Sequence, residues 1–204
     1  MSTVEKNQLV TVKIEDMTDK GEGIGKVDGY TLFLKDTVIG DVVEARVMKT
    51  KKTYGYARLL RVLSPSPDRT EPRCPVAGPC GGCQLQSMTY EAQLRFKERK
   101  VRGHLIRLGG QENPPVRPTL GMVDPWEYRN KAQFPVGRGR EGQVIAGFYG
   151  ARSHRIVETE RCFLGGPVQQ EILEIVKGWM EAFHIAPYEE ETGKGLVRHV
   201  LIRE

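Results

Sequence analysis

The four cysteine thiols are the side chains of this sequence best suited to chemistry, and three of them lie within ten residues. Cys74, Cys80 and Cys83 follow the pattern C-x5-C-x2-C, and Cys162 stands 79 positions after Cys83. The glycines and prolines between them, in CPVAGPCGGC, predict an irregular loop and disfavour a helix. Such a loop can turn several thiols toward one point.

Three kinds of site use thiols in this way: disulfides, a structural zinc site and an iron–sulfur cluster. The first twenty residues lack the apolar segment of a signal peptide, and no apolar run is long enough to span a bilayer. We therefore expect a cytoplasmic protein with reduced thiols, which disfavours disulfides. Zinc sites usually pair two C-x2-C units, and this sequence has one. Three clustered cysteines and a remote fourth favour an iron–sulfur cluster, with zinc and four unrelated buried thiols as alternatives.

Residues 1–63 alternate apolar and polar side chains in five short segments separated by glycine-containing turns. This arrangement predicts a small closed β-barrel of the OB type, a frequent binder of single-stranded nucleic acid. The five predicted strands are Gln8–Glu15, Ile24–Val27, Tyr30–Lys35, Asp41–Met48 and Gly55–Leu63.

The formal net charge of +5 and the pI of about 9.0 suggest a polyanionic partner. No acidic residue occurs between Ala45 and Leu63, whereas residues 166–204 hold 4 basic and 7 acidic side chains. Cations neutralise phosphates and aromatic rings stack on unpaired bases. The predicted RNA-binding residues of the barrel are Lys49, Lys51, Lys52, Tyr54 and Arg58. The alternative is a solvated hairpin whose tyrosines pack inward.

Beyond a proline-rich linker, the sequence predicts two helices and a mostly antiparallel sheet, so the whole chain is mainly β with some α. The first helix follows Ser87 or Thr89, stops at Gly109–Gly110 and carries basic side chains that are either phosphate-facing or simply solvated. Its expected apolar face is Tyr90, Leu94, Val101, Leu105 and Leu108. The second helix opens at Gly166-Pro167, and its expected buried side is Val168, Ile172, Ile175, Val176, Trp179 and Phe183. The predicted strands are Lys131–Gly137, Gln143–Tyr149, Arg155–Glu158 and a last one containing Leu196, Val200 and Ile202.

Four segments resemble one enzyme family over nearly the whole chain. They are CPVAGPCGGCQLQSMTYEAQLRFK, YRNKAQFPVG, GFYGARSHRIV and GLVRHVLIR. The chain is similar to the bacterial uracil-5-methyltransferases that act on 23S ribosomal RNA. This resemblance implies that residues 1–63 are a TRAM domain, an OB-like RNA-binding module. It also implies that Cys74, Cys80, Cys83 and Cys162 ligate a [4Fe–4S] cluster. Residues 64–125 would then hold the iron–sulfur loop and a helix, with linkers, and residues 126–204 would begin a central RNA-binding domain.

The family transfers a methyl group from S-adenosylmethionine to carbon 5 of uracil. A cysteine attacks carbon 6, the enolate takes the methyl group, and a base removes the proton from carbon 5 of the flipped-out nucleotide. The resemblance places the methyl-donor site and the reacting groups in a C-terminal Rossmann-like domain. The strand–GxG–helix unit of such a domain does not occur in these 204 residues. We therefore expect the chain alone to bind RNA without methylating it, and no catalytic residue is assigned here.

Further RNA contacts are expected from YRNKAQF, which opens the central domain. Its candidates are Arg129, Asn130, Lys131 and Gln133, with a sheet edge capped by polar groups as the alternative. The sequence leaves two alternatives to a ribosomal-RNA methyltransferase. One is part of a transfer-RNA uracil-5-methyltransferase, and the other is a non-catalytic RNA-binding or regulatory protein with a structural metal site. The expected partner is a single-stranded or loop region of RNA, with no membrane and no protein partner implied.

Overall fold

The computed structural model describes residues 4–151 and 153–204, and the chain divides into two compact units. The first unit consists of Met1–Pro72 and Gln84–Gly121. The second unit consists of Arg73–Cys83 and Met122–Glu204. The loop with three cysteines therefore belongs to the same unit as Cys162, although 79 residues separate Cys83 from Cys162 in the sequence.

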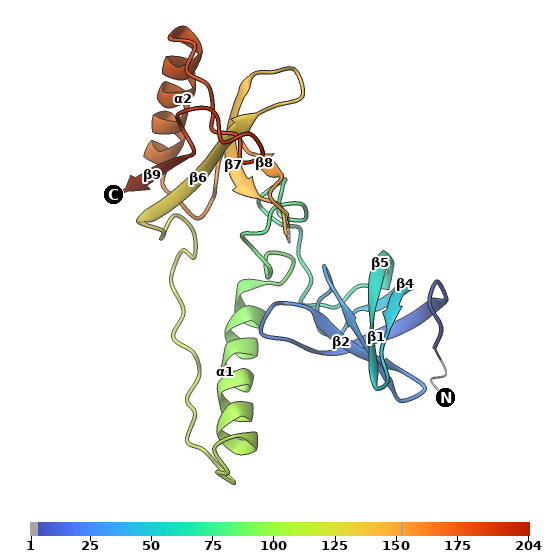
Figure 1. Cartoon of the computed structure of the whole chain (residues 1–204). Helices are drawn as coiled ribbons and strands as arrows, with labels where there is room; N and C mark the ends of the chain where they lie inside the picture. Colours follow the sequence, from blue (N-terminus) through green and yellow to red (C-terminus); the bar gives the residue numbers. More distant parts are fainter. Residues whose placement is uncertain (1–3, 152) are drawn as a thin grey trace. The chain divides into compact units, whose positions relative to one another are not determined.

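Five strands of the first unit close into a barrel with the order β1-β2-β3-β5-β4 (Figure 1). Strands β3 and β5 are parallel, and all other neighbours, including the closing pair β1 and β4, are antiparallel. The strands are β1 (Leu9–Met17), β2 (Gly23–Val27), β3 (Tyr30–Leu34), β4 (Val42–Thr50) and β5 (Tyr54–Ser64). The predicted five-stranded barrel is thus confirmed.

Alternation along the strands separates the barrel core from its outer face. In β3, Tyr30, Leu32 and Leu34 are buried, whereas Thr31 and Phe33 between them are only partly covered. Side chains of consecutive strand residues point to opposite faces, so the second set lies outside. Val27 of β2 is partly buried against a core made of aliphatic side chains from the other four strands: Val10, Val12, Ile14, Leu32, Leu34, Val43, Ala45, Val47 and Ala57.

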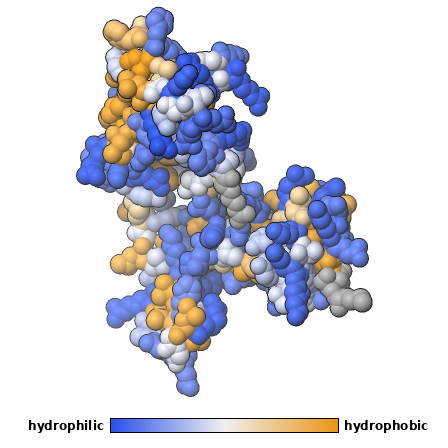
Figure 2. Space-filling view, in the orientation of Figure 1, coloured by the Kyte–Doolittle hydropathy of each residue, from blue (hydrophilic) through white to orange (hydrophobic). Residues whose placement is uncertain are grey.

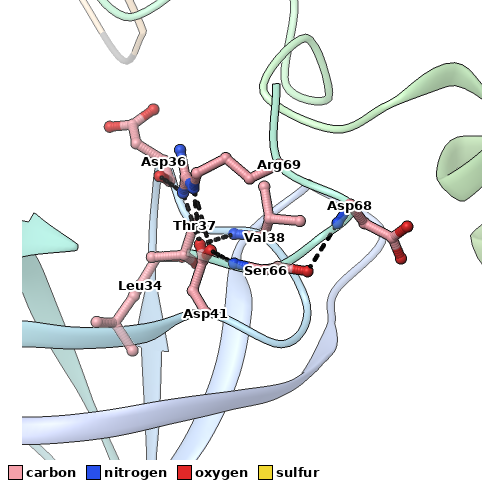
Figure 3. Close-up of polar contacts among 8 residues, drawn as sticks. All are labelled: Leu34, Asp36, Thr37, Val38, Asp41, Ser66, Asp68 and Arg69. Carbon is pink, nitrogen blue, oxygen red and sulfur yellow. Dashed lines mark hydrogen bonds and ion pairs between the residues drawn. The ribbon is translucent and has the colours of Figure 1, made fainter. Parts of the chain in front are cut away.

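A buried carboxylate joins the turn before β4 to the segment after β5 (Figure 3). The side chain of Asp41 is fully buried and accepts hydrogen bonds from the amides of Val38 (2.7 Å) and Ser66 (2.9 Å). The guanidinium of Arg69 donates to both carboxylate oxygens, at 3.0 and 2.6 Å, and to the carbonyl oxygen of Asp36 at 3.0 Å. One side chain therefore fixes two segments that are 25 residues apart in the sequence.

Helix α1 (Tyr90–Arg107) follows Thr89 and ends before Gly109–Gly110, as predicted, but Thr89 makes no side-chain capping bond. The expected apolar face is only partly covered, since Tyr90, Leu94 and Leu105 are half-buried. The buried residues of α1 are Ala92 and Phe96, which pack with Met17, Val38 and Met88, whereas Val101 and Leu108 are 51% and 82% exposed.

Several basic side chains of α1 have partners within the first unit. Arg95 pairs with Asp68 at 2.5 Å and Lys100 with Asp19 at 2.7 Å. Arg102 donates to Glu98 and to the carbonyl oxygens of Pro114 and Val116. These three cations therefore serve the fold of the unit, which favours the solvated interpretation of this helix over a phosphate-binding face.

The second unit is built on a four-stranded antiparallel sheet with the order β8-β7-β6-β9. Its strands are β6 (Lys131–Arg138), β7 (Val144–Tyr149), β8 (Ile156–Glu158) and β9 (His199–Arg203). On one face of the sheet, Phe134, Val136, Ala146 and Ile202 form a core with helix α2 (Pro167–Ala182). The predicted antiparallel sheet is confirmed.

Helix α2 is apolar on more than the face that covers the sheet. Leu173 and Met180 are buried and Ile172 and Val176 are partly buried in the core. The predicted buried side is therefore only partly right, because four of its six members are exposed: Val168, Ile175, Trp179 and Phe183. Figure 2 shows the apolar surface that these residues leave over α2. Neither α2 nor any other helix in the described ranges is long and apolar enough to cross a membrane.

Candidate RNA-binding face and cysteine cluster

The predicted RNA-binding residues of the barrel lie together at one hairpin. Lys49 is near the end of β4, Lys51 and Lys52 are in the turn, and Tyr54 and Arg58 are on β5. The turn is held by the hydroxyl of Tyr30, which accepts a hydrogen bond from the amide of Lys51 at 3.1 Å. The same hydroxyl lies 2.8 Å from the carbonyl oxygen of Lys51 and also contacts that of Tyr54. The backbone carrying the two turn lysines is therefore anchored to the barrel.

The four cations of this hairpin are available to a ligand. Lys49, Lys51, Lys52 and Arg58 are exposed, and in the described part of the chain none of them pairs with a carboxylate. Their neighbour Arg61 differs, because its guanidinium lies 3.0 Å from the carboxylate of Glu44. That contact raises the pKa of Arg61 and lowers the pKa of Glu44. The unpaired cations give the hairpin a local positive charge that phosphates can neutralise.

Tyr54 does not pack into the core but contacts two other aromatic rings. Its ring centroid lies 5.6 Å from that of Phe33 and 5.8 Å from that of Tyr56, both in edge-to-face orientation. The alternative of inward-packing tyrosines is therefore wrong for Tyr54 and Tyr56, whose strand neighbours Gly55 and Ala57 face the core. Sequence reasoning missed Phe33 as a candidate, although a phenylalanine at an outward position of the YTLFL alternation was the signal that it could have used.

The four candidates of YRNKAQF lie where the sheet of the second unit begins. The backbone of Arg129 bonds to Leu164 (2.8 Å) and to the side chain of Gln169 (3.0 Å), so part of this segment does cap the sheet. Asn130 is exposed, and Lys131 and Gln133 are exposed on the side of β6 opposite the buried Ala132 and Phe134. Their side chains are thus accessible, and their RNA role stays a prediction.

The cysteine loop packs against the end of β7. Cys80 forms a β-bridge with Gly150, and the amide of Gly81 donates to the carbonyl oxygen of Tyr149 at 3.0 Å. A Cβ atom on Gly81 would lie only 2.9 Å from that oxygen, so a side chain at this position would force the two backbones apart. A glycine is therefore required where the loop meets the strand.

Residues next to two of the cysteines are in direct contact. The guanidinium of Arg73 lies over the rings of Phe163, at 4.8 Å, and Trp126, at 5.1 Å. Arg73 precedes Cys74, and Phe163 follows Cys162. This stacking holds the start of the cysteine loop beside the segment that carries the fourth cysteine.

All four cysteines are half-buried, and their thiols are not joined in disulfides within the described structure. Burial raises the pKa of Cys74, the amide of Val76 opposes this, and electrostatic contributions from Cys80 and Cys162 raise the pKa further. The amide of Gly82 lies 3.4 Å from the Sγ atom of Cys80, a contact that would stabilise a thiolate.

These observations fit the donor set of an iron–sulfur cluster in residue type and in neighbourhood. They do not amount to a formed site, since no three His, Cys, Asp or Glu side chains among the described residues are positioned to hold a metal ion. Cys83 lies in the same loop and is half-buried. The predicted ligand set thus remains a prediction.

Comparisons with known proteins concern the barrel and the chain as a whole. Residues 3–60 match the family model of the TRAM domain. An uncharacterized RNA methyltransferase of Halalkalibacterium halodurans is 48% identical over 200 residues, which is 98% of this chain and 43% of that protein. One of Staphylococcus epidermidis is 42% identical over 203 residues, which is all of this chain and 44% of that protein.

A solved structure shares the fold over nearly the whole chain. The tRNA (uracil-54, C5)-methyltransferase of Pyrococcus abyssi, solved with S-adenosyl-L-homocysteine, superposes with a TM-score of 0.65 at 24% identity. The match covers 95% of this chain and 42% of that protein. The chain is therefore similar, over nearly all of its length, to proteins named as RNA methyltransferases, of which it spans less than half, and it carries a TRAM-type barrel.

Proposed function

We propose that this chain is the RNA-binding and iron–sulfur portion of a cytoplasmic, S-adenosylmethionine-dependent methyltransferase that modifies carbon 5 of uridine in 23S ribosomal RNA. The observation that carries the proposal is the barrel in the TRAM-matching region, whose β4–β5 hairpin presents unpaired cations beside aromatic rings. The names of the similar proteins support an RNA methyltransferase as the parent. The methyl donor and the reacting groups belong to the remainder of the parent protein.

In this proposal Cys74, Cys80, Cys83 and Cys162 hold a [4Fe–4S] cluster. Four thiolates are the usual ligands of such a cluster. The cluster would supply a covalent connection between the cysteine loop and the segment after β8. Methyl transfer to uracil requires no electron, so we assign the four residues a structural role that fixes the RNA-binding surfaces of the second unit, including Arg129, Asn130, Lys131 and Gln133.

The activity is tested on the product of the complete reading frame, incubated with S-adenosylmethionine and either 23S ribosomal RNA or transfer RNA lacking the modification. We expect 5-methyluridine in the ribosomal RNA by mass spectrometry of nuclease digests, and none with the 204-residue chain alone. Methylation confined to transfer RNA would replace the proposed substrate with the transfer-RNA alternative. Absence of methylation in both RNAs would leave a non-catalytic RNA-binding protein as the better description.

The contribution of the turn lysines is tested by changing Lys51 and Lys52 together to alanine. Each lysine that neutralises one phosphate of single-stranded RNA adds about 0.7 to the slope of log K against log salt. The double variant is therefore expected to bind more weakly, with a slope shallower by about 1.4. Affinities for an unpaired oligonucleotide are measured across a series of salt concentrations. Arg61→Ala is the matched control, because the Arg61 charge is already paired with Glu44. A double variant with the wild-type slope would exclude both lysines from the interface.

A further inference from the structure

Three aromatic rings form a continuous patch on the outer face of the barrel. Phe33 comes from β3, and Tyr54 and Tyr56 come from β5. Each ring centroid lies 5.6 to 5.8 Å from the other two, so all three are in mutual contact. All three residues are only half-buried, so part of each ring remains open to solvent.

The strand register shows what surrounds the rings. Phe33 lies opposite Tyr56 in the parallel β3–β5 pair, with Ile24 beyond Phe33 on β2 and Lys49 beyond Tyr56 on β4. One row of outward positions therefore crosses four strands, a width of about 14 Å at the usual strand spacing. In this row the rings of Phe33 and Tyr56 lie at the centre, and the cation of Lys49 lies at the β4 end.

Cations flank the patch in the neighbouring rows as well. Tyr54 lies opposite Thr31, and Thr31 lies opposite Lys26 on β2. Arg58 follows Tyr56 on the outer face of β5 and lies opposite Arg46 of β4. Lys26, Arg46 and Arg58 are exposed, and none of them pairs with a carboxylate in residues 4–151 and 153–204.

A surface of this composition suits one kind of ligand. An aromatic patch alone would fit an apolar protein surface, but surrounding unpaired cations favour a polyanion. Within a duplex the base faces are already stacked, so only unpaired nucleotides can offer a base face and a phosphate at the same time.

We propose that the outer face of β2, β3, β5 and β4 stacks unpaired RNA bases on Phe33, Tyr54 and Tyr56 while Lys26, Lys49 and Arg58 contact the flanking phosphates. This inference rests on the proposed RNA binding of the barrel and states which form of RNA it takes and by which rings. Base edges play no part, so discrimination between bases is weak and discrimination between unpaired and paired RNA is strong.

The test compares the 204-residue protein with a Phe33→Leu, Tyr56→Leu double variant. Leucine keeps an apolar side chain but removes the ring, and the removal of two stacking partners is expected to weaken binding of an unpaired uridine-containing oligonucleotide about tenfold to a hundredfold. Affinity for a duplex of the same length and charge is expected to change less than about twofold, since its bases are already stacked. Ile24→Ala, at the non-aromatic position of the same row, is the matched control and should bind like the wild type.

The outcomes separate this inference from the function on which it rests. A double variant that is folded by circular dichroism and binds the unpaired oligonucleotide as the wild type does would overturn the stacking role. Equal losses of affinity for unpaired and duplex RNA would overturn it too, because they would indicate a general disruption of the surface. If the wild-type chain binds neither RNA, the RNA-binding function itself fails.

Discussion

Replacing Asp41 with asparagine is expected to lower the free energy of unfolding of the first unit by about 3 kcal/mol, because it breaks a buried ion pair from one side. The amide cannot accept from Val38, Ser66 and both nitrogens of Arg69 as the carboxylate does. It also leaves the guanidinium of Arg69, whose side chain is 21% exposed, without its counter-ion. The loss of stability is measured by urea unfolding, with hydrogen exchange of the barrel amides as the probe.

The same replacement should change how stability depends on pH. Burial acts to raise the pKa of Asp41, but the hydrogen bonds from Arg69, Ser66 and Val38 outweigh it and hold the pKa below its usual range. A lowered folded-state pKa stabilises the fold above the unfolded pKa of about 3.9, and this stabilisation is lost as the pH falls through the folded value. The difference between wild type and variant should therefore be full above about pH 5 and shrink below about pH 4.

Two controls make this prediction specific. Glu44→Gln removes the exposed pair with Arg61 on the same barrel and should leave the unfolding midpoint nearly unchanged. Trp126 and Trp179 both lie in the second unit, so tryptophan fluorescence should show an unaltered transition in the Asp41 variant. A variant whose barrel amides exchange as slowly as those of the wild type would show that the Asp41 network contributes little.

The barrel was predictable because its signal is local. Alternation in β1, β3 and β4 gives strand type and core face together, and each of these strands begins and ends within two residues of its predicted bounds. The Asp41 network was not predictable, since nothing in the sequence around Asp41 indicates that Ser66 and Arg69 return to it. Contacts between distant segments depend on how the barrel closes.

The helices show a second limit of the sequence. Periodicity located α1 and α2, but the apolar face that it assigned to each helix is only partly covered. Both helices carry apolar side chains around more of their circumference than one contact can cover. The choice of Phe96 and Met180 as buried residues is made by their neighbours, Met17 and Val38 for the first and the sheet of β6, β7 and β9 for the second.

The predicted cysteine site depends both on a local sequence pattern and on a contact between distant segments. The spacing C-x5-C-x2-C is local and predicted a site, whereas the approach of the Cys162 segment to that loop arises from the path of β7 and β8. Stacking of Arg73 on Phe163 contributes to that approach, and no pattern in the sequence pairs these two residues. The prediction of a shared site therefore needed the family resemblance, whereas the contact between the two segments that carry the cysteines could come only from the fold.

Replacing Cys80 with serine is expected to abolish the bound iron, because it removes one of the four thiolates that the proposed cluster uses as ligands. Anaerobically purified wild-type protein should contain about four irons per chain and show the broad visible absorbance of a cluster. The Cys80→Ser protein should be nearly colourless. Iron and sulfide analysis, together with the visible spectrum, measures the effect.

Gly78→Ser is the matched control for this prediction, because it adds the same hydroxymethyl group to the same loop. A Cβ atom at Gly78 would meet nothing within 4 Å, and all four thiols remain. The control should therefore keep its iron. Iron retained in Cys80→Ser would remove Cys80 from the ligand set, and a colourless wild type with one zinc per chain would replace the cluster with the zinc alternative. Loss of iron in Cys80→Ser alone would tie the metal to the thiol, since both variants carry the same serine side chain in the same segment.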